Sequence, residues 1–142
     1  MSDTLTVCGL TIERGTKLRT YLPVPDTNVK IPLTIINGEK DGPTLLITAG
    51  IHGGEYPGIA AAMELGRDIE PEHVTGCLIM MHPVNIQGFW ARREMIVPED
   101  GKNLNRVFPG DPTGTLADKT AYLISNNFFP IADFYVDMHS GD

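Results

Sequence analysis

Two histidines and a glutamate in this sequence have the residue types of a zinc site. His52 and Glu55 are separated only by Gly53 and Gly54, and His139 follows much later in the chain. Catalytic zinc ions commonly take three protein ligands, two histidines and a glutamate being one such set, and keep a further position open. Taken alone, a His-x-x-Glu spacing is also typical of polar surface residues or of a helix N-cap. A metal site therefore requires a fold that brings His139 to the same place.

The segment before His52 has the pattern of a buried strand. The run Leu45–Ala49 is short and rich in apolar residues, and it ends at a glycine, which is typical of a strand that is covered on both faces. A helix from Pro57 to about Arg67 can follow, because proline is favoured in the first turn of a helix. His52 and Glu55 would then lie in a strand-to-helix turn, where open α/β sheets bind their ligands.

Two further apolar runs are predicted to extend the same sheet. Gly76–His82 follows the helix, and it should lie parallel to the first strand because it completes a β-α-β unit. Phe134–His139 is predicted as the last strand, after a helix from about Thr115 to Asn127. A parallel strand at this position would carry His139 to the edge where His52 and Glu55 lie.

Short strands joined by turns precede the central strand. Leu5–Val7, Lys17–Leu22 and Ile31–Ile36 are predicted as strands, and their close spacing favours an antiparallel flank. Ile86–Thr113 has no clear period, and we expect a long irregular segment of a kind that is uncommon in domains unless it is functional. The expected fold class is α/β, with a mixed, largely parallel sheet flanked by helices.

The composition argues against several classes of partner. The formal net charge of −7 does not suit a nucleic-acid or anionic membrane surface, which needs clustered lysine and arginine. The N-terminal residues lack the pattern of a secretory signal, and no apolar run approaches the roughly 20 residues of a membrane span. Cys8 and Cys77 form no paired motif, as expected of reduced thiols. We therefore expect a cytoplasmic protein that binds neither nucleic acid nor membrane.

Three motifs, in a fixed order, carry a resemblance to a known enzyme family. They are HGGE at His52–Glu55, NLNRVFPG at Asn103–Gly110 and DMHSGD at Asp137–Asp142. Together they resemble the succinylglutamate desuccinylase/aspartoacylase family of the zinc carboxypeptidase superfamily, over most of the chain from Thr44 onward. The resemblance implies a carboxypeptidase-like fold and one Zn²⁺ ion, held by the two histidines and the glutamate described above.

The second motif is implied to bind the substrate. By resemblance, Asn105 and Arg106 hold a substrate carboxylate, and an arginine upstream of them polarises the scissile carbonyl. A guanidinium offers a planar fork of donors that suits a carboxylate, and the amide of Asn105 adds a neutral donor beside it. The candidates for the upstream arginine are Arg93 and Arg92, of which we prefer Arg93.

Two residues are expected to support the metal ligands. A metal-bound histidine normally donates its second ring N–H to an oxygen acceptor, which fixes the orientation of the ring. Asn103 occupies a position where relatives often carry an aspartate for this purpose, and its amide oxygen can accept the same hydrogen bond without adding charge. Asp137 is an alternative acceptor, or else a carboxylate that caps the adjacent loop.

The resemblance also implies a general-base glutamate well beyond the third zinc ligand, and this chain has no residue at such a position. Glu64, Glu94 and Glu99 do not match it. We therefore expect residues 1–142 to be the N-terminal portion of a single zinc-hydrolase catalytic domain, with 1–43 as flanking early strands, and to have little activity alone. The strand that carries His139 would then present an exposed edge through which the chain can self-associate.

The function implied for the complete enzyme is zinc-dependent hydrolysis of the amide bond of a small anionic N-acyl amino acid or a similar amide. Two alternatives share the same residues. One is a zinc carboxypeptidase that acts on peptides, and the other is a zinc-binding module without catalytic activity. Metal analysis separates all three from an ordinary α/β domain, and an activity assay then separates enzyme from module.

Overall fold

Five strands form the main sheet, in the spatial order β3-β4-β6-β5-β7. The computed structural model describes residues 3–141. The strands of the main sheet have the following bounds: β3 Thr16–Pro23, β4 Lys30–Asn37, β5 Lys40–Ala49, β6 Thr75–Met81 and β7 Phe134–Met138. The first two strands, β1 (Thr4–Val7) and β2 (Leu10–Glu13), form a separate antiparallel hairpin.

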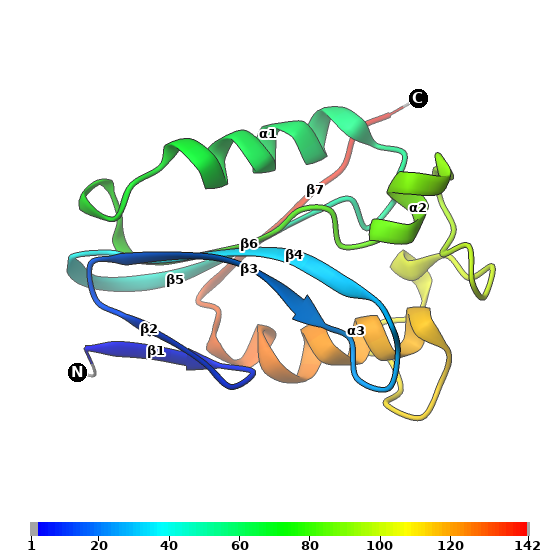
Figure 1. Ribbon diagram of the computed structural model, residues 1–142, viewed down its shortest axis with the longest axis horizontal. Coiled ribbons are helices and arrows are strands. Elements are labelled where there is room, and N and C mark those ends of the chain that lie inside the picture. The colour runs from blue at the N-terminus through cyan, green and yellow to red at the C-terminus, as the bar shows by residue number, and fades with distance from the viewer. Residues whose placement is uncertain (1–2, 142) are drawn as a thin grey trace.

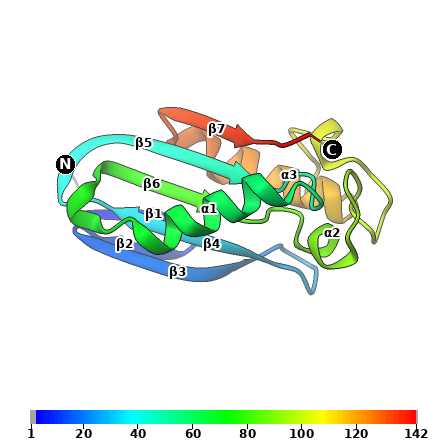
Figure 2. The ribbon, with the colours of Figure 1, turned by 90° about the horizontal axis from the view of Figure 1, so that it is seen from above.

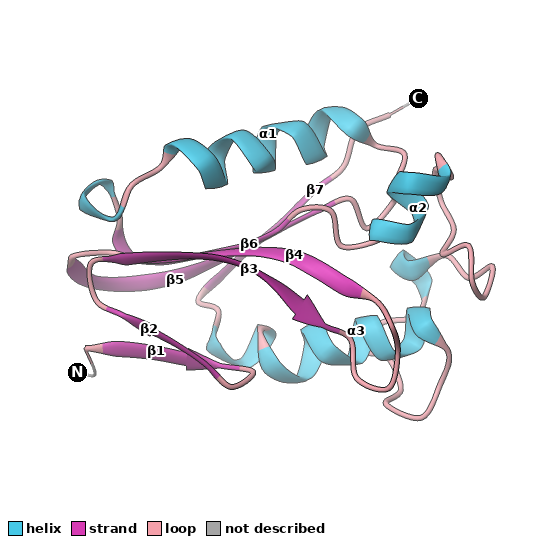
Figure 3. Cartoon of the chain, viewed as in Figure 1, coloured by secondary structure: helices cyan, strands magenta, loops and turns pink. Residues whose placement is uncertain are grey.

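Helices connect these strands (Figure 3). Within residues 3–141 they are three α-helices and three short 3₁₀ helices. Their bounds are α1 Tyr56–Asp68, η1 Pro71–His73, α2 Ile86–Ala91, η2 Leu104–Arg106, α3 Leu116–Asn127 and η3 Phe129–Ile131. The helix α1 lies over one face of the sheet, and α3 lies over the other together with the β1–β2 hairpin (Figures 1 and 2).

The sheet is mixed. The early strands are antiparallel, since β4 pairs in that sense with both β3 and β6. By contrast, β5 lies between β6 and β7 and is parallel to both. These pairings confirm the α/β class, the mixed sheet with flanking helices and the antiparallel flank. They also place the carboxyl ends of β5 and β7 side by side, at the end of the sheet where α1 begins (Figure 2).

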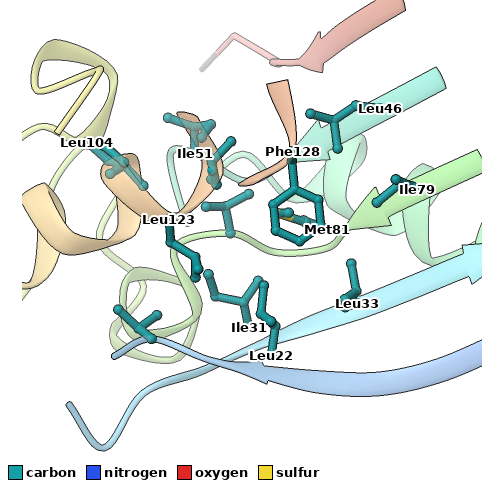
Figure 4. Packing of buried hydrophobic residues seen from close by; sticks show 14 of the residues in the cluster. Leu22, Ile31, Leu33, Leu46, Ile51, Ile79, Met81, Leu104, Leu123 and Phe128 are labelled. Carbon is teal, nitrogen blue, oxygen red and sulfur yellow. The ribbon is translucent and has the colours of Figure 1, made fainter. Parts of the chain in front are cut away.

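The two faces of β5 contribute to two different apolar clusters. Leu46 belongs to the larger cluster, which includes Leu123 and Ile124 of α3 and the nearby Phe128. Ile47 belongs to a smaller cluster, on which Ile69 packs just after α1. Phe128 lies among side chains from several strands (Figure 4), and it is fully buried. The core thus fixes β5, whose carboxyl end leads directly to His52.

The structure corrects the expectation of an irregular segment from residue 86 to 113 only at α2 and η2, and the remainder of this described range has no helix or strand. Residues Ile86–Ala91 form α2, and the side-chain oxygen of its N-cap residue Asn85 accepts the backbone N–H of Gly88 at 2.9 Å. This helix is shorter than two turns, so it shows no helical period in the sequence. The short strand β2 was also not predicted, because only Ile12 of its four residues is buried.

The strand β7 lies at one edge of the main sheet, and among the described strands it pairs only with β5. Its apolar residues Phe134, Tyr135 and Val136 are 62%, 43% and 45% exposed. This agrees with an exposed edge at the strand that precedes His139. A search of the described helices found none with both the length and the apolar character needed to cross a membrane.

Candidate metal centre

His52, Glu55 and His139 meet at the carboxyl end of the parallel strands. The turn that follows β5 carries His52, and Glu55 is the N-cap residue of α1. His139 directly follows β7, in which Met138 pairs with Ala49 of β5. Because the two strands are parallel neighbours, their last residues lie together even though most of the chain separates them in sequence.

The three side chains converge on the carboxylate of Glu55. Nδ1 of His52 lies 2.8 Å from Oε1 of Glu55, and Nδ1 of His139 lies 2.9 Å from Oε2. The two imidazole rings are in edge contact, with centroids 5.1 Å apart. One ligand atom from each residue can be chosen so that all three lie within 4.8 Å of one another, and this is the only such group of three found in the described chain.

The opposite ring nitrogen of each histidine has an oxygen partner. Nε2 of His52 lies 3.0 Å from Oδ1 of Asn103, and Nε2 of His139 lies 2.7 Å from Oδ2 of Asp137. If these oxygens accept the Nε2–H groups, Nδ1 is the atom that each histidine has available for a metal. Asn103 and Asp137 thus contact the two histidines in the way expected of supporting residues.

The electrostatics of the cluster favour an ionised glutamate. Burial raises the pKa of Glu55, but its contact with His52 and the hydrogen bond from the backbone N–H of Ser140 outweigh this effect, and the pKa lies below its ordinary value. Burial lowers the pKa of His139, but its contacts with Asp137 and Glu55 reverse the direction and raise it. The cluster therefore carries a carboxylate at neutral pH, as a metal ligand must.

The two glycines of the turn are needed because backbone packs directly against them. A Cβ atom on Gly53 would lie 2.4 Å from the carbonyl carbon of Gly88 in α2, closer than real Cβ contacts. A Cβ atom on Gly54 would lie 2.8 Å from Cα of Glu94. The segment that follows α2 is thereby held against the turn between His52 and Glu55.

This set of donors fits zinc. Two imidazole nitrogens and a carboxylate oxygen are one of the common protein ligand sets of catalytic zinc, with a position left for another ligand. In both histidines Nδ1 faces the carboxylate of Glu55, and Nε2 has an oxygen partner at the far side of the ring. The fit rests on the donor types and on their convergence.

Asn105, Arg106 and Arg93, which were expected to bind the substrate, lie on neighbouring loops. Among the described residues, none of them forms a hydrogen bond or salt bridge with His52, Glu55 or His139. The backbone N–H of Asn105 donates to Oδ1 of Asn103 at 2.9 Å, so η2 is attached to the oxygen that also contacts His52. Arg106 is exposed, and Arg93 directly precedes the residue that packs on Gly54. Neither arginine forms a salt bridge within residues 3–141, so both guanidinium groups are available for an anion.

Sequence reasoning missed two residues behind His139. Oγ1 of Thr48 lies 2.7 Å from Oδ1 of Asp137 and 2.8 Å from the hydroxyl oxygen of Tyr135. Tyr135 and Thr48 are 87 residues apart in sequence, so no local pattern connects them. The only signal was the hydroxyl of Thr48 in the otherwise apolar run Leu45–Ala49.

Comparison with known proteins agrees with the three motifs. A family model described as the succinylglutamate desuccinylase/aspartoacylase catalytic domain matches residues 41–142. This region begins in β5 and contains the whole cluster of His52, Glu55 and His139. The N-alpha-acetyl-L-2,4-diaminobutyric acid deacetylase of Halomonas elongata is 41% identical to the chain over an alignment of 128 residues, and the match covers 85% of this chain and 37% of the deacetylase.

The chain is also similar to solved structures, one of which is described as a member of the same family. An ectoine utilization protein from Ruegeria pomeroyi, determined with bound product, is 39% identical with a TM-score of 0.82, and the match covers 88% of this chain and 40% of that one. A succinylglutamate desuccinylase/aspartoacylase from Rhodobacter sphaeroides is 37% identical with a TM-score of 0.79, over 87% of this chain and 39% of that one. The chain therefore spans about two fifths of the length of these relatives.

Proposed function

The chain belongs to the succinylglutamate desuccinylase/aspartoacylase family, as its motifs indicated, and from this premise we propose that the whole protein is a zinc-dependent deacylase of small N-acyl amino acids. The observation that carries the proposal is the proximity of His52, Glu55 and His139, whose ligand atoms can all lie within 4.8 Å of one another. We further propose that residues 1–142 are the N-terminal portion of the catalytic domain.

One set of residues is proposed to hold the metal, and another set is proposed to hold the substrate. His52, Glu55 and His139 would bind one Zn²⁺ ion, with Asn103 and Asp137 fixing the two rings. The chemistry that zinc supplies at such a site is Lewis-acid activation of water and of the scissile carbonyl. The described residues thus provide the metal centre, and the proton-transferring base is not assigned among them.

Arg106 and Asn105 are proposed to bind the carboxylate of the amino-acid part of the substrate. Arg106 is exposed, and its guanidinium pairs only with the neutral backbone oxygen of Asn105, at 3.2 Å. A guanidinium that has no acidic partner among the described residues can therefore orient an anionic substrate so that its amide meets the metal. Arg93 is proposed to polarise the carbonyl oxygen of that amide.

The names of the relatives indicate which substrates to test. The whole protein, loaded with zinc, should release amine from at least one of N-alpha-acetyl-L-2,4-diaminobutyrate, N-acetylaspartate and N-succinylglutamate. A His139→Ala variant should lose both the zinc and the activity. If a peptide is the only substrate cleaved, the carboxypeptidase alternative holds, and if zinc binds without any turnover, the non-catalytic module holds.

A further inference from the structure

A continuous set of hydrogen bonds leads from His139 into the sheet. Nε2 of His139 lies 2.7 Å from Oδ2 of Asp137, whose Oδ1 lies 2.7 Å from Oγ1 of Thr48. The Thr48 oxygen lies 2.8 Å from the hydroxyl oxygen of Tyr135. Thr48 is on β5, directly opposite Asp137 of β7 in the parallel ladder. The side chain that supports His139 is therefore itself held from the neighbouring strand.

The donors and acceptors of this network can be assigned from their chemistry. An ionised carboxylate only accepts hydrogen bonds, so Asp137 accepts from both Thr48 O–H and His139 Nε2–H. Thr48 has then used its single proton, and its oxygen accepts the O–H of Tyr135. With the Nε2 proton held by Asp137, Nδ1 is the nitrogen of His139 that can bind a metal.

The hydroxyl of Thr48 is not explained by packing. Thr48 is fully buried, between Ile47 and Ala49, which are also buried. A valine has nearly the same shape and suits a strand equally well, and it would not bring a polar group into the core. Both hydrogen-bond partners of the hydroxyl, Tyr135 and Asp137, are on β7. The hydroxyl therefore serves to hold the carboxylate of Asp137.

We propose that Thr48 is a positioning residue for the metal centre, which acts by fixing the carboxylate of Asp137 and thereby the orientation of His139. The proposal rests on the proposed function, because the orientation matters through the metal. The Asp137 side chain is 22% exposed, so without Thr48 it can rotate toward solvent. Tyr135 contributes one step further away by holding the hydroxyl of Thr48.

Two variants of the whole protein test this role. Thr48→Val keeps the shape of the side chain and removes the hydroxyl, and Thr48→Ser keeps the hydroxyl and removes a methyl group. Substitution of a residue that supports a metal ligand typically weakens metal binding by about 10-fold to 100-fold. We expect Thr48→Val to weaken zinc binding, measured by competition with a chromogenic chelator, by about 10-fold, and Thr48→Ser to remain close to the wild type.

A second measurement separates positioning from general stability. Side-chain ¹⁵N NMR of the metal-free protein reads the protonation of each His139 nitrogen, and Thr48→Val should alter the Nε2–H signal whereas Thr48→Ser should not. Unchanged zinc affinity and an unchanged His139 signal in Thr48→Val would overturn the proposal. Equal losses in both variants, in proportion to a lower melting temperature, would overturn it as well.

The same measurement distinguishes this proposal from the proposed function. If the wild-type protein binds no zinc, the deacylase proposal fails. A change of the His139 Nε2–H signal in Thr48→Val would still show that Thr48 fixes Asp137 and His139, although not as parts of a metal centre. The absence of that change would overturn it.

Discussion

Oδ1 of Asn103 lies 3.0 Å from Nε2 of His52, so a neutral amide supports this histidine whereas a carboxylate supports His139. The same Asn103 oxygen accepts the backbone N–H of Asn105 and caps η2. Asn103 therefore joins the cluster of His52, Glu55 and His139 to the loop that carries Arg106. The two histidines therefore differ in the charge of the group behind them: His52 contacts a neutral amide and His139 contacts a carboxylate.

We expect Asn103→Asp to tighten zinc binding. Aspartate can cap η2 equally well and accept the His52 hydrogen bond, and its charge makes the imidazole a stronger ligand. Asn103→Ala should instead weaken zinc binding by about 10-fold or more. Both are measured by chelator competition. As a control for net charge, Asn28→Asp adds the same charge on an exposed turn, and an equal gain in affinity there would contradict the explanation.

Zinc should stabilise the folded protein through His139. A ligand that binds only the folded state at 100 times its dissociation constant adds about 2.7 kcal/mol to the free energy of unfolding. Thermal unfolding with zinc and with a chelator should show this increment in the wild type and not in His139→Ala. His73 is exposed on η1, outside the cluster, so His73→Ala should keep the increment. Loss of the increment in both variants would argue against a specific site.

The turn between His52 and Glu55 should not tolerate a side chain at Gly53. A Cβ atom there would overlap the backbone of Gly88 and Phe89, which cannot move without shifting α2. We expect Gly53→Ala to lower the free energy of unfolding by about 1–3 kcal/mol, as overpacking does, and to weaken zinc binding. Gly58 is the matched control because its Cβ would have ordinary contacts from 3.4 Å outward. Gly58→Ala should be neutral or stabilising, since alanine favours a helix.

The free energy of unfolding should depend on pH through Asp118, which pairs with Lys102 in the loop next to Asn103. Hydrogen bonds from Lys102 and from the backbone N–H of Thr115 lower the pKa of Asp118, against a smaller opposing effect of burial. Because its folded pKa lies below the unfolded value of about 3.9, its stabilisation is complete above that pH. The stabilisation is lost as the pH falls through the lower folded pKa.

Asp118→Asn tests this dependence. The amide cannot pair with Lys102 as a carboxylate does, and we expect a loss of about 1 kcal/mol in the free energy of unfolding at pH 7, typical of a lost helix cap. The difference from the wild type should shrink at pH 3 and below. Urea unfolding at both pH values measures it. Glu64→Gln removes an exposed carboxylate on α1 and should show no such convergence.

The sequence was sufficient to predict the elements that carry the metal cluster. The strands that end near His52 and at His139 and the helix that starts after Glu55 have strong local patterns, and the parallel order of these strands followed from β-α-β connectivity. The short helix α2 could not be predicted in this way, because its six residues are too few to show a helical period.

The residues behind the cluster were harder to predict than the cluster. Asn103 was found because it lies in a recognisable motif. Thr48 was not found, because its importance comes from the register that places it opposite Asp137, and 89 residues separate the two in sequence. A strand pattern predicts which face a residue lies on, but it does not predict the residue that it meets on the next strand.

The roles of Arg92 and Arg93 remain as proposed from sequence, and their backbones suggest how to separate them. Arg92 has a φ of 53° and is the C-cap of α2, a left-handed conformation that glycine adopts more easily. Arg92→Gly should therefore fold at least as stably as the wild type. If Arg93 polarises the scissile carbonyl, Arg92→Gly should keep most of the turnover rate.

Arg93→Ala should then lower the turnover rate of the zinc-loaded whole protein by about 100-fold or more, as removal of a group that stabilises developing charge on an oxygen typically does. Zinc affinity should stay the same in both variants, because neither arginine contacts the metal ligands. Steady-state kinetics on an N-acyl amino acid, with zinc content measured for each preparation, compares them. A large loss in Arg92→Gly with Arg93→Ala unaffected would assign the role to Arg92, since both substitutions remove the same charge from adjacent positions.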